Sequence, residues 1–173
     1  MKNIYNYFKE INKLNETIRT GWINRKIPLE RLESVGEHTF TMALLALSVI
    51  DKYNLELNID KVMKMSVIHE LGEIDIGDIA LPNEEQAKKK YIGELNCVTR
   101  ICNVLDEQWM LDLWKEFEEK KTKEAEFVYK MDKLQAVMQA KYYSEKINDN
   151  NETFEDFYNN ALDKCKEYLE IVE

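Results

Sequence analysis

The sequence contains few of the residues that build turns and cross-links. Its 173 residues include only 5 Gly, 2 Pro and 3 Cys. So few turn residues argue against a β-sandwich, and no collagen-like repeat or low-complexity segment is present. With 45% hydrophobic and 33% charged residues, the composition favours a single all-α domain over residues 1–173.

The three cysteines, Cys97, Cys102 and Cys165, are an odd number without CxxC spacing. They predict neither a disulfide framework nor a zinc ribbon, and they indicate a reducing compartment. The N-terminus lacks the apolar core of a signal peptide. The longest apolar run, residues 43–50, is far shorter than the roughly 20 residues that span a bilayer. We therefore expect a cytoplasmic protein with no membrane partner.

Positive charge is also scarce. The chain has 24 Lys and Arg residues against 33 Asp and Glu residues, a formal net charge of -9. Such a balance argues against a nucleic acid polymer as partner. It does not exclude a small phosphorylated molecule, because one cation or a bound metal can dominate a single site.

Hydrophobic periodicity predicts helices at residues 4–18, 34–53, 60–69, 83–105, 107–119, 123–146 and 154–172. Ser34 and Glu37 have capping-box spacing, and Asp60 is the predicted N-cap of the helix that follows. Residues 20–28 and 72–82 are predicted to be loops. The basic runs at residues 88–90 and 115–123 are expected to be solvated helix faces.

The chain has only two histidines, His38 and His69, and both lie on predicted apolar helix faces. Either could be a satisfied core histidine or a functional ligand, because a buried imidazole needs a partner. The acidic residues that follow His69 favour a cation site, since a cation relieves their mutual repulsion; they are Glu70, Glu73, Asp75 and Asp78. The zinc-protease motif HExxH is excluded because Glu73 stands where its second histidine belongs.

Asp132 is a carboxylate on an apolar helix face, four residues after Val128 and four before Ala136. A buried carboxylate must be paired, ligated or protonated. Two alternatives stay open: an ion pair with Lys133, or a further ligand for the same metal.

Four blocks stand in order along the chain: Arg19-Thr20-Gly21-Trp22, Glu33-Ser34-Val35-Gly36-Glu37-His38, His69-Glu70 with Glu73 and Gly77-Asp78-Ile79, and Asp132-Lys133-Leu134-Gln135-Ala136. Together they resemble the HD-domain metal-dependent phosphohydrolases, and among these the 5'-deoxynucleotidases. The blocks span residues 19–136. The resemblance implies an all-α HD-domain helical bundle, commonly a homodimer, that acts on a nucleotide.

The resemblance also implies that His38, His69, Glu70 and Asp132 bind one divalent metal. Glu70 departs from the family, which has Asp at this position, and its extra methylene moves the carboxylate by roughly 1 Å. A second metal held by additional histidines is not expected, because the chain has only two. Mixed His and carboxylate ligands suit Mn, Fe, Co, Ni or Zn.

The activity implied by the resemblance is hydrolysis of a (deoxy)nucleoside 5'-monophosphate. Glu73 would orient or deprotonate the attacking water, and Asp78 would assist, as proton donor to the leaving 5'-oxygen. Arg19 is the candidate for the substrate phosphate and Trp22 for the sugar or base. Read without the family, Arg19 is a surface ion-pair residue and Trp22 a core aromatic.

Two other functions remain open from the sequence. The same scaffold could cleave a deoxynucleoside triphosphate. Alternatively, the protein could bind a nucleotide with weakened or lost catalysis, because Glu70 replaces the usual Asp. The presence of Glu73 and Asp78 argues against that second alternative, since binding alone needs neither.

Overall fold

The computed structural model describes residues 4–80 and 82–171. Over these residues the chain is helical, and its only β-type contact is an isolated antiparallel bridge between Ile18 and Ser34. The elements are α1 (Ile4–Asn12), the 3-10 turn η1 (Lys13–Asn15), α2 (Thr20–Asn24), α3 (Val35–Tyr53), α4 (Ile59–Ile68), α5 (Glu73–Ile76), α6 (Glu84–Leu105), α7 (Gln108–Glu119), α8 (Lys123–Ile147) and α9 (Glu152–Leu169). The all-α prediction is confirmed.

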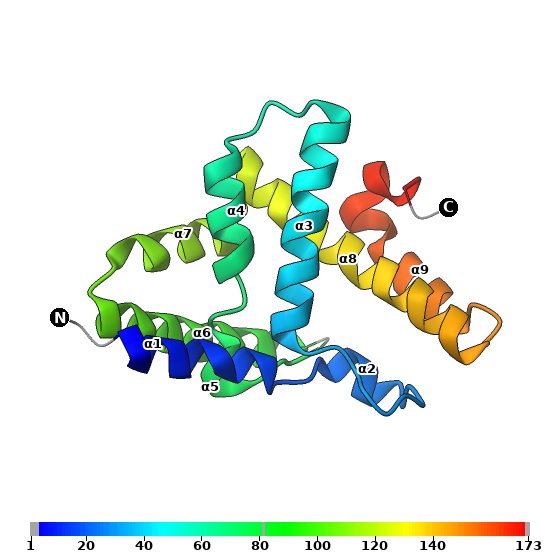
Figure 1. The fold of residues 1–173 in the computed structure, drawn as a ribbon, viewed down its shortest axis with the longest axis horizontal. Coiled ribbons are helices and arrows are strands. Elements are labelled where there is room, and N and C mark those ends of the chain that lie inside the picture. The colour runs from blue at the N-terminus through cyan, green and yellow to red at the C-terminus, as the bar shows by residue number, and fades with distance from the viewer. Residues whose placement is uncertain (1–3, 81, 172–173) are drawn as a thin grey trace.

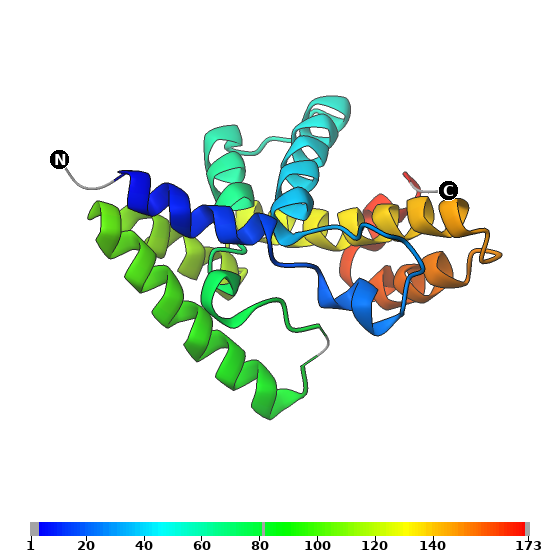
Figure 2. The same ribbon diagram turned by 60° about the horizontal axis from the view of Figure 1, so that its bottom comes forward.

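The helices form two groups, which the turn between α4 and α5 connects and which also meet where α7 packs on α4 and α8 (Figure 1). In one group, α3 and α4 pack on the long α8, and α9 folds back along it; their core includes Met42, Val62, Met131 and Leu134. In the other group, α1, α5 and α7 pack around α6. Figure 2 shows the short α2 beside the hairpin of α8 and α9. Residues of the turn between α4 and α5 therefore face both groups.

The predicted helix starts at Ser34 and Asn83 are confirmed by their caps. The Ser34 amide donates to Glu37 Oε2 at 2.9 Å, and the Glu37 amide donates to Ser34 Oγ at 3.2 Å. Asn83 and Gln86 form the same reciprocal pair at the start of α6. Each cap satisfies amides that have no partner within the helix, a contribution of about 1 kcal/mol.

Three local predictions are wrong. The first helix ends at Asn12 rather than residue 18, because the backbone beyond it pairs with the segment before α3: the Val35 amide donates to the Thr17 carbonyl at 2.8 Å. Residues 20–24 form α2 rather than a loop. The N-cap of α4 is Asn58, whose side chain accepts from the Lys61 amide; Asp60 instead pairs with Lys64 at 2.8 Å.

The predicted loop at residues 72–82 contains the short helix α5, which is a further correction. Gly72 precedes α5 where the turn packs against α6, and a Cβ at Gly72 would lie 2.5 Å from Glu94 Cβ. Gly77 ends α5 with a φ of +74°, a conformation that favours glycine. These two glycines bring the acidic segment close to α4 and α6.

The last helix is also shifted from its prediction. It begins at Glu152, and its backbone departs from helical geometry at Cys165 before it ends at Leu169. Residue 172, the predicted end, lies outside the described residues. In the part of the chain that the structure describes, no helix has the length and apolar character needed to cross a membrane.

Candidate metal centre

Four predicted ligands meet where α3, α4 and α8 pack together, although they come from three separate parts of the chain. His38 lies in the first turn of α3, His69 caps the end of α4, Glu70 follows it, and Asp132 lies within α8. One potential ligand atom from each residue lies within 4.8 Å of those from the other three. The folding of α3, α4 and α8 onto one another thus gathers a His, His, Glu, Asp cluster.

The imidazole nitrogens of this cluster fit a divalent metal. His38 Nε2 lies 3.2 Å from Asp132 Oδ1, and His69 Nε2 lies 3.5 Å from Glu70 Oε1. Both Nε2 atoms are buried and have no hydrogen-bond partner among the described residues. Buried polar atoms without partners are rare and call for a ligand. Two imidazoles and two carboxylates suit a divalent transition metal.

The Nδ1 atoms of the two imidazoles explain why both Nε2 atoms face the cluster. His69 Nδ1 lies 2.8 Å from the Ser66 carbonyl, which can only accept, so Nδ1 donates. His38 Nδ1 lies 2.6 Å from Gln135 Oε1. A proton on Nδ1 leaves the lone pair on Nε2, as metal ligation requires. Burial is the main reason that the pKa of His69 lies below its ordinary value, which favours the neutral ring.

Glu70 reaches the cluster despite its extra methylene. Its Oε1 lies 3.8 Å from His38 Nε2 and accepts a hydrogen bond from Arg19 at 3.0 Å. Burial opposes ionisation of Glu70, but the His69 imidazole and the Arg19 guanidinium outweigh it and lower its pKa to about 2. Glu70 is therefore ionised at neutral pH and available as a ligand.

Asp132 makes both contacts that the sequence left as alternatives. Its Oδ2 pairs with Lys133 Nζ at 2.7 Å, while its Oδ1 faces His38. Burial opposes its ionisation, but the Lys133 ammonium first, and then the nearby His38 ring and Arg19 guanidinium, hold the pKa of Asp132 well below its usual range. The ion pair and the orientation toward the cluster therefore coexist, one on each oxygen.

Arg19, at the N-terminal boundary of α2, reaches across the cluster. One guanidinium nitrogen contacts Glu70, and the other lies 4.0 Å from Asp132 Oδ1. Burial would lower its pKa, but the surrounding carboxylates, Glu70 first, raise it above the ordinary value. Arg19 is thus a partly buried cation, with 16% of its side chain exposed, next to the candidate metal ligands.

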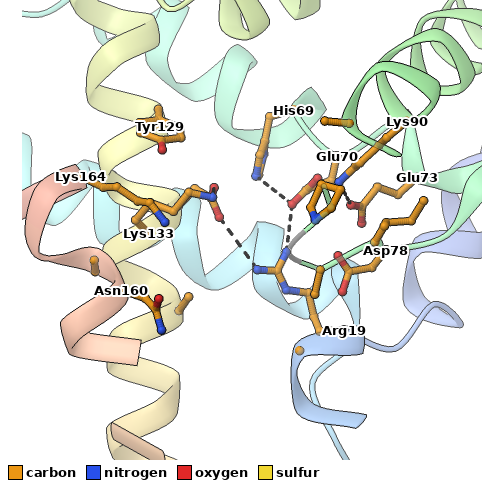
Figure 3. A pocket seen from close by; sticks show the side chains of 18 of the residues that line it. Arg19, His69, Glu70, Glu73, Asp78, Lys90, Tyr129, Lys133, Asn160 and Lys164 are labelled. Carbon is orange, nitrogen blue, oxygen red and sulfur yellow. Dashed lines mark hydrogen bonds and ion pairs between the residues drawn. The ribbon is translucent and has the colours of Figure 1, made fainter. Parts of the chain in front are cut away.

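A cavity of about 470 Å³ opens beside the cluster, and Arg19, Glu73 and Asp78 line it. Figure 3 shows Glu73, Asp78 and Lys90 on one side of Arg19, and Tyr129, Lys133, Asn160 and Lys164 on the other. The cavity therefore has acidic and basic groups on one side of Arg19 and two lysines on the other. A volume of this size accommodates a small organic ligand.

Glu73 is the most unusual carboxyl in the cavity. Its side chain is 1% exposed, its Oε1 lies 3.1 Å from Lys90 Nζ, and its Oε2 has no hydrogen-bond partner among the described residues. Burial first, and then the nearby Glu70 carboxylate, raise its pKa to about 9, although Lys90 opposes this. A pKa of about 9 favours the protonated form of Glu73 at neutral pH.

Asp78 follows Gly77 and connects α5 to α2. It accepts hydrogen bonds from the Thr20 amide and, at 2.9 Å, from the Thr20 hydroxyl. The Ala80 amide in turn donates to the Thr20 hydroxyl at 3.1 Å. These bonds hold the first turn of α2, and with it Arg19, against the acidic segment.

Trp22 packs as a core aromatic at the wall of the same cavity. It is 1% exposed, and its ring stacks on Phe157 with the centroids 4.5 Å apart. Its indole nitrogen donates to Glu33 Oε2 at 3.0 Å. Little of its surface faces the cavity, which limits its contact with a sugar or base.

Sequence reasoning missed three polar residues near the cluster: Lys90, Glu33 and Gln135. Lys90 was expected on a solvated face, but its side chain is 21% exposed and contacts both Glu73 and Glu94. The Lys90–Glu94 spacing of four residues was a usable signal for α6. Glu33 and Gln135 stand inside the quoted sequence blocks, yet nothing in their spacing indicates that they meet.

Comparisons with known proteins agree with this site. A family model described as an HD domain matches residues 11–172. The chain is 31% identical over 175 residues to the protein named 5'-deoxynucleotidase HDDC2 of Xenopus laevis, covering 99% of this chain and 84% of that protein. It is 35% identical over 152 residues to the protein of the same name in Dictyostelium discoideum, covering 83% and 78%.

Solved structures show the same architecture. A protein of Pyrococcus horikoshii OT3 superposes with a TM-score of 0.77 at 26% identity, covering 97% of this chain and 95% of that one. The implied HD-domain helical bundle is therefore confirmed. With the family model matching almost the whole length and a 35% identical relative of which the chain covers most, the chain belongs to the HD-domain family.

Proposed function

We propose that this protein is a metal-dependent phosphohydrolase that removes phosphate from deoxynucleoside 5'-monophosphates. The observation that carries the proposal is the meeting of the His, His, Glu, Asp cluster with Arg19 and Glu73 at one cavity. The name 5'-deoxynucleotidase, which similar proteins carry, supports this substrate class.

His38, His69, Glu70 and Asp132 would hold one divalent metal, with Mn, Co, Fe, Ni and Zn as the candidates. When bound there, such an ion supplies electrostatic stabilisation of phosphoryl oxygens. The chain places its own cation, Arg19, beside this cluster. Guanidinium binds phosphate oxygens in a bidentate manner, and Arg19 is held in place by Glu70 at 3.0 Å. We therefore assign Arg19 to the substrate phosphate.

Glu73 is the proposed proton-transfer group. Because its pKa is raised to about 9, it carries a proton at neutral pH and suits donation to the leaving 5'-oxygen better than removal of a proton from water. Asp78 accepts hydrogen bonds from Thr20, and we assign it to positioning the segment that carries Arg19. This exchanges the proton-donor role expected for Asp78 with that of Glu73.

Two alternatives have specific support. Lys133, which contacts Asp132, and Lys164 line the cavity on the side of Arg19 opposite Glu73 (Figure 3). Such cations would suit the additional phosphates of a deoxynucleoside triphosphate. A nucleotide-binding protein with lost catalysis is motivated by Glu70, which stands in place of Asp. The second alternative does not explain why Glu73 is buried and protonated beside the cluster.

The decisive experiment measures metal content and phosphate release together. Protein purified without chelator is analysed for metal, and deoxynucleoside mono-, di- and triphosphates are supplied with Mn, Co, Ni, Zn or Mg. We expect about one metal per chain and inorganic phosphate from monophosphates. A Glu70→Asp variant run in parallel should retain the metal.

Each other outcome selects an alternative. Release of triphosphate or pyrophosphate from triphosphates alone would favour the second enzyme. A chain that binds metal and nucleotide but gains turnover only as Glu70→Asp would show that catalysis has been lost through Glu70. Absence of metal from both forms would overturn the proposed centre.

The homodimer implied by the family resemblance belongs to the same proposal. Phe40 and Leu44 lie one turn apart on α3 and are 64% and 50% exposed. A second copy that covers them would remove apolar surface from water. Sedimentation equilibrium of the purified protein measures the oligomeric state directly.

A further inference from the structure

A buried chain of hydrogen bonds leads from Trp22 to the His38 imidazole. The Trp22 indole donates to Glu33 Oε2 at 3.0 Å. Gln135 Nε2 donates to Glu33 Oε1 at 2.6 Å, and Gln135 Oε1 lies 2.6 Å from His38 Nδ1. The two contacts of Gln135 join residues 102 and 97 positions apart. Trp22, Glu33 and Gln135 are not members of the four-residue cluster of candidate ligands.

The four residues of this chain of hydrogen bonds are buried. Glu33 is 6% exposed, Gln135 4%, Trp22 1% and His38 0%. Gln135 Nε2 also donates to the hydroxyl of Thr41, at an exposed position, at 3.0 Å. The contacts among the four residues themselves lie in the core, where each polar group must find a partner. The Glu33 backbone amide also donates to Tyr143 Oη at 2.8 Å, which holds the start of the chain in place.

The donor and acceptor groups allow only one direction of donation along this chain of hydrogen bonds. An indole can only donate, and an ionised carboxylate can only accept. The Gln135 amide must therefore turn its NH2 group to Glu33 and its oxygen to His38. His38 Nδ1 is then obliged to donate, and the lone pair remains on Nε2, which faces Asp132.

We propose that Glu33 and Gln135 are positioning residues that select the metal-binding tautomer of His38, with Trp22 orienting Glu33. The proposal rests on the metal centre of the proposed function. These residues explain why His38 turns an unprotonated Nε2 toward the cluster. His69 needs no such residues, because a backbone carbonyl three residues earlier accepts from its Nδ1.

A single substitution, Glu33→Gln, should reverse the direction of donation in the hydrogen bonds between residue 33, Gln135 and His38. The new amide must turn its oxygen to the Trp22 donor and its NH2 group to Gln135. Gln135 then presents its oxygen to residue 33 and its NH2 group to His38. His38 Nδ1 becomes an acceptor, the proton moves to Nε2, and the ligand lone pair is lost from the cluster.

A second substitution should restore the original direction. In the double variant Glu33→Gln with Gln135→Glu, a carboxylate at position 135 accepts from both residue 33 and His38 Nδ1. The two variants carry the same buried group at position 33 and differ only at position 135. Gln135→Glu alone also keeps an acceptor against His38, but it places a second carboxyl against Glu33 Oε1, so one of the two must take up a proton.

The tautomer can be read directly by two-bond proton–nitrogen NMR correlation of the ring nitrogens. The chain has only two histidines, so untagged 15N-labelled protein contains two ring systems, assigned with a His69→Gln variant. We expect the Nδ1-H form of His38 in the wild type and the double variant, and the Nε2-H form in Glu33→Gln. The His69 signals should not change.

Zinc affinity, measured by competition with a chelator, gives the second readout. Loss of a residue that orients a ligand typically weakens metal binding by about 10- to 100-fold. We expect this loss in Glu33→Gln and recovery in the double variant. Zinc binding requires no substrate, so the result does not depend on the nucleotidase activity.

The outcomes separate the two proposals. If Glu33→Gln keeps the Nδ1-H form of His38, or if the double variant fails to restore it in a folded chain, the positioning role is overturned. If the tautomers change as expected while wild-type protein binds no metal, the positioning role stands and the proposed function fails. A circular dichroism spectrum of each variant verifies that it is folded.

Discussion

Glu70 and Glu73 lie three residues apart beside one cavity, yet their carboxyls have opposite protonation states. Glu70 contacts Arg19 and His69, and its pKa falls to about 2. Among the described residues, Glu73 pairs with the Lys90 ammonium, but burial and the Glu70 carboxylate outweigh it and raise the pKa of Glu73 to about 9. Desolvation acts on both, so the difference comes from their neighbours. The turn thus provides an ionised ligand and a proton-holding group, a separation that acid–base catalysis uses.

The largest effects are expected when each of the two carboxyls is neutralised in turn. Glu70→Gln should lose metal, because a negative ligand is removed. Glu73→Gln should keep metal but lower kcat by about 10²- to 10⁴-fold, the typical contribution of proton transfer. Metal analysis and steady-state kinetics on the same preparations separate the two effects.

Glu85→Gln serves as the control, because Glu85 is an exposed carboxylate on α6 that pairs with Lys89. It should match the wild type in both assays. The assignment of Glu70 and Glu73 to different roles would be wrong if both variants lost metal equally.

The opposite pKa shifts of Glu70 and Glu73 predict opposite pH dependences of the free energy of unfolding in metal-depleted protein. The lowered pKa of Glu70 contributes stability above pH 4.5 that is lost as the pH falls toward 2. The raised pKa of Glu73 contributes stability below pH 4.5 that is lost as the pH rises toward 9. Relative to the wild type, the Tm of Glu73→Gln should therefore increase progressively with pH across that interval. A constant difference in Tm would contradict the raised pKa.

The smallest expected effect concerns Lys90, which lies 3.1 Å from Glu73 Oε1. Its ammonium favours the ionised form of Glu73, so Lys90→Met should raise the pKa of Glu73 further. If Glu73 donates a proton, the alkaline limb of the kcat profile moves to higher pH. Lys89→Met, at an exposed position that contacts Glu85, should leave the profile unchanged. A shift of the limb to lower pH would exclude Glu73 as the donor.

Much of the candidate site could be predicted from the sequence, because its residues interrupt the hydrophobic pattern of their helices. His38, His69 and Asp132 are polar groups on apolar helix faces, and such positions demand a partner. The structure brings these residues and Glu70 within 4.8 Å of one another. The helix starts at Ser34 and Asn83 could also be predicted, because capping depends on residues three positions apart.

The elements that sequence reasoning misplaced depend on distant partners. The helix α2 begins at Thr20, whose amide and hydroxyl are held by Asp78, 58 residues further on. Lys90 leaves the solvent because Glu73 approaches α6 through the turn at Gly72. No local propensity describes a contact of this kind, since helix signals extend over only a few residues.

The sequence by itself determined the all-helical composition, the helix starts with their own caps, and the identity of the groups gathered around the candidate metal centre. These properties depend on side-chain chemistry and on contacts within one or two turns. Only the tertiary structure decided the raised pKa of Glu73 and the hydrogen-bonded contacts that link Trp22, Glu33 and Gln135 to His38. Both depend on burial and on partners brought together from remote helices, and desolvation exists only once the chain has folded.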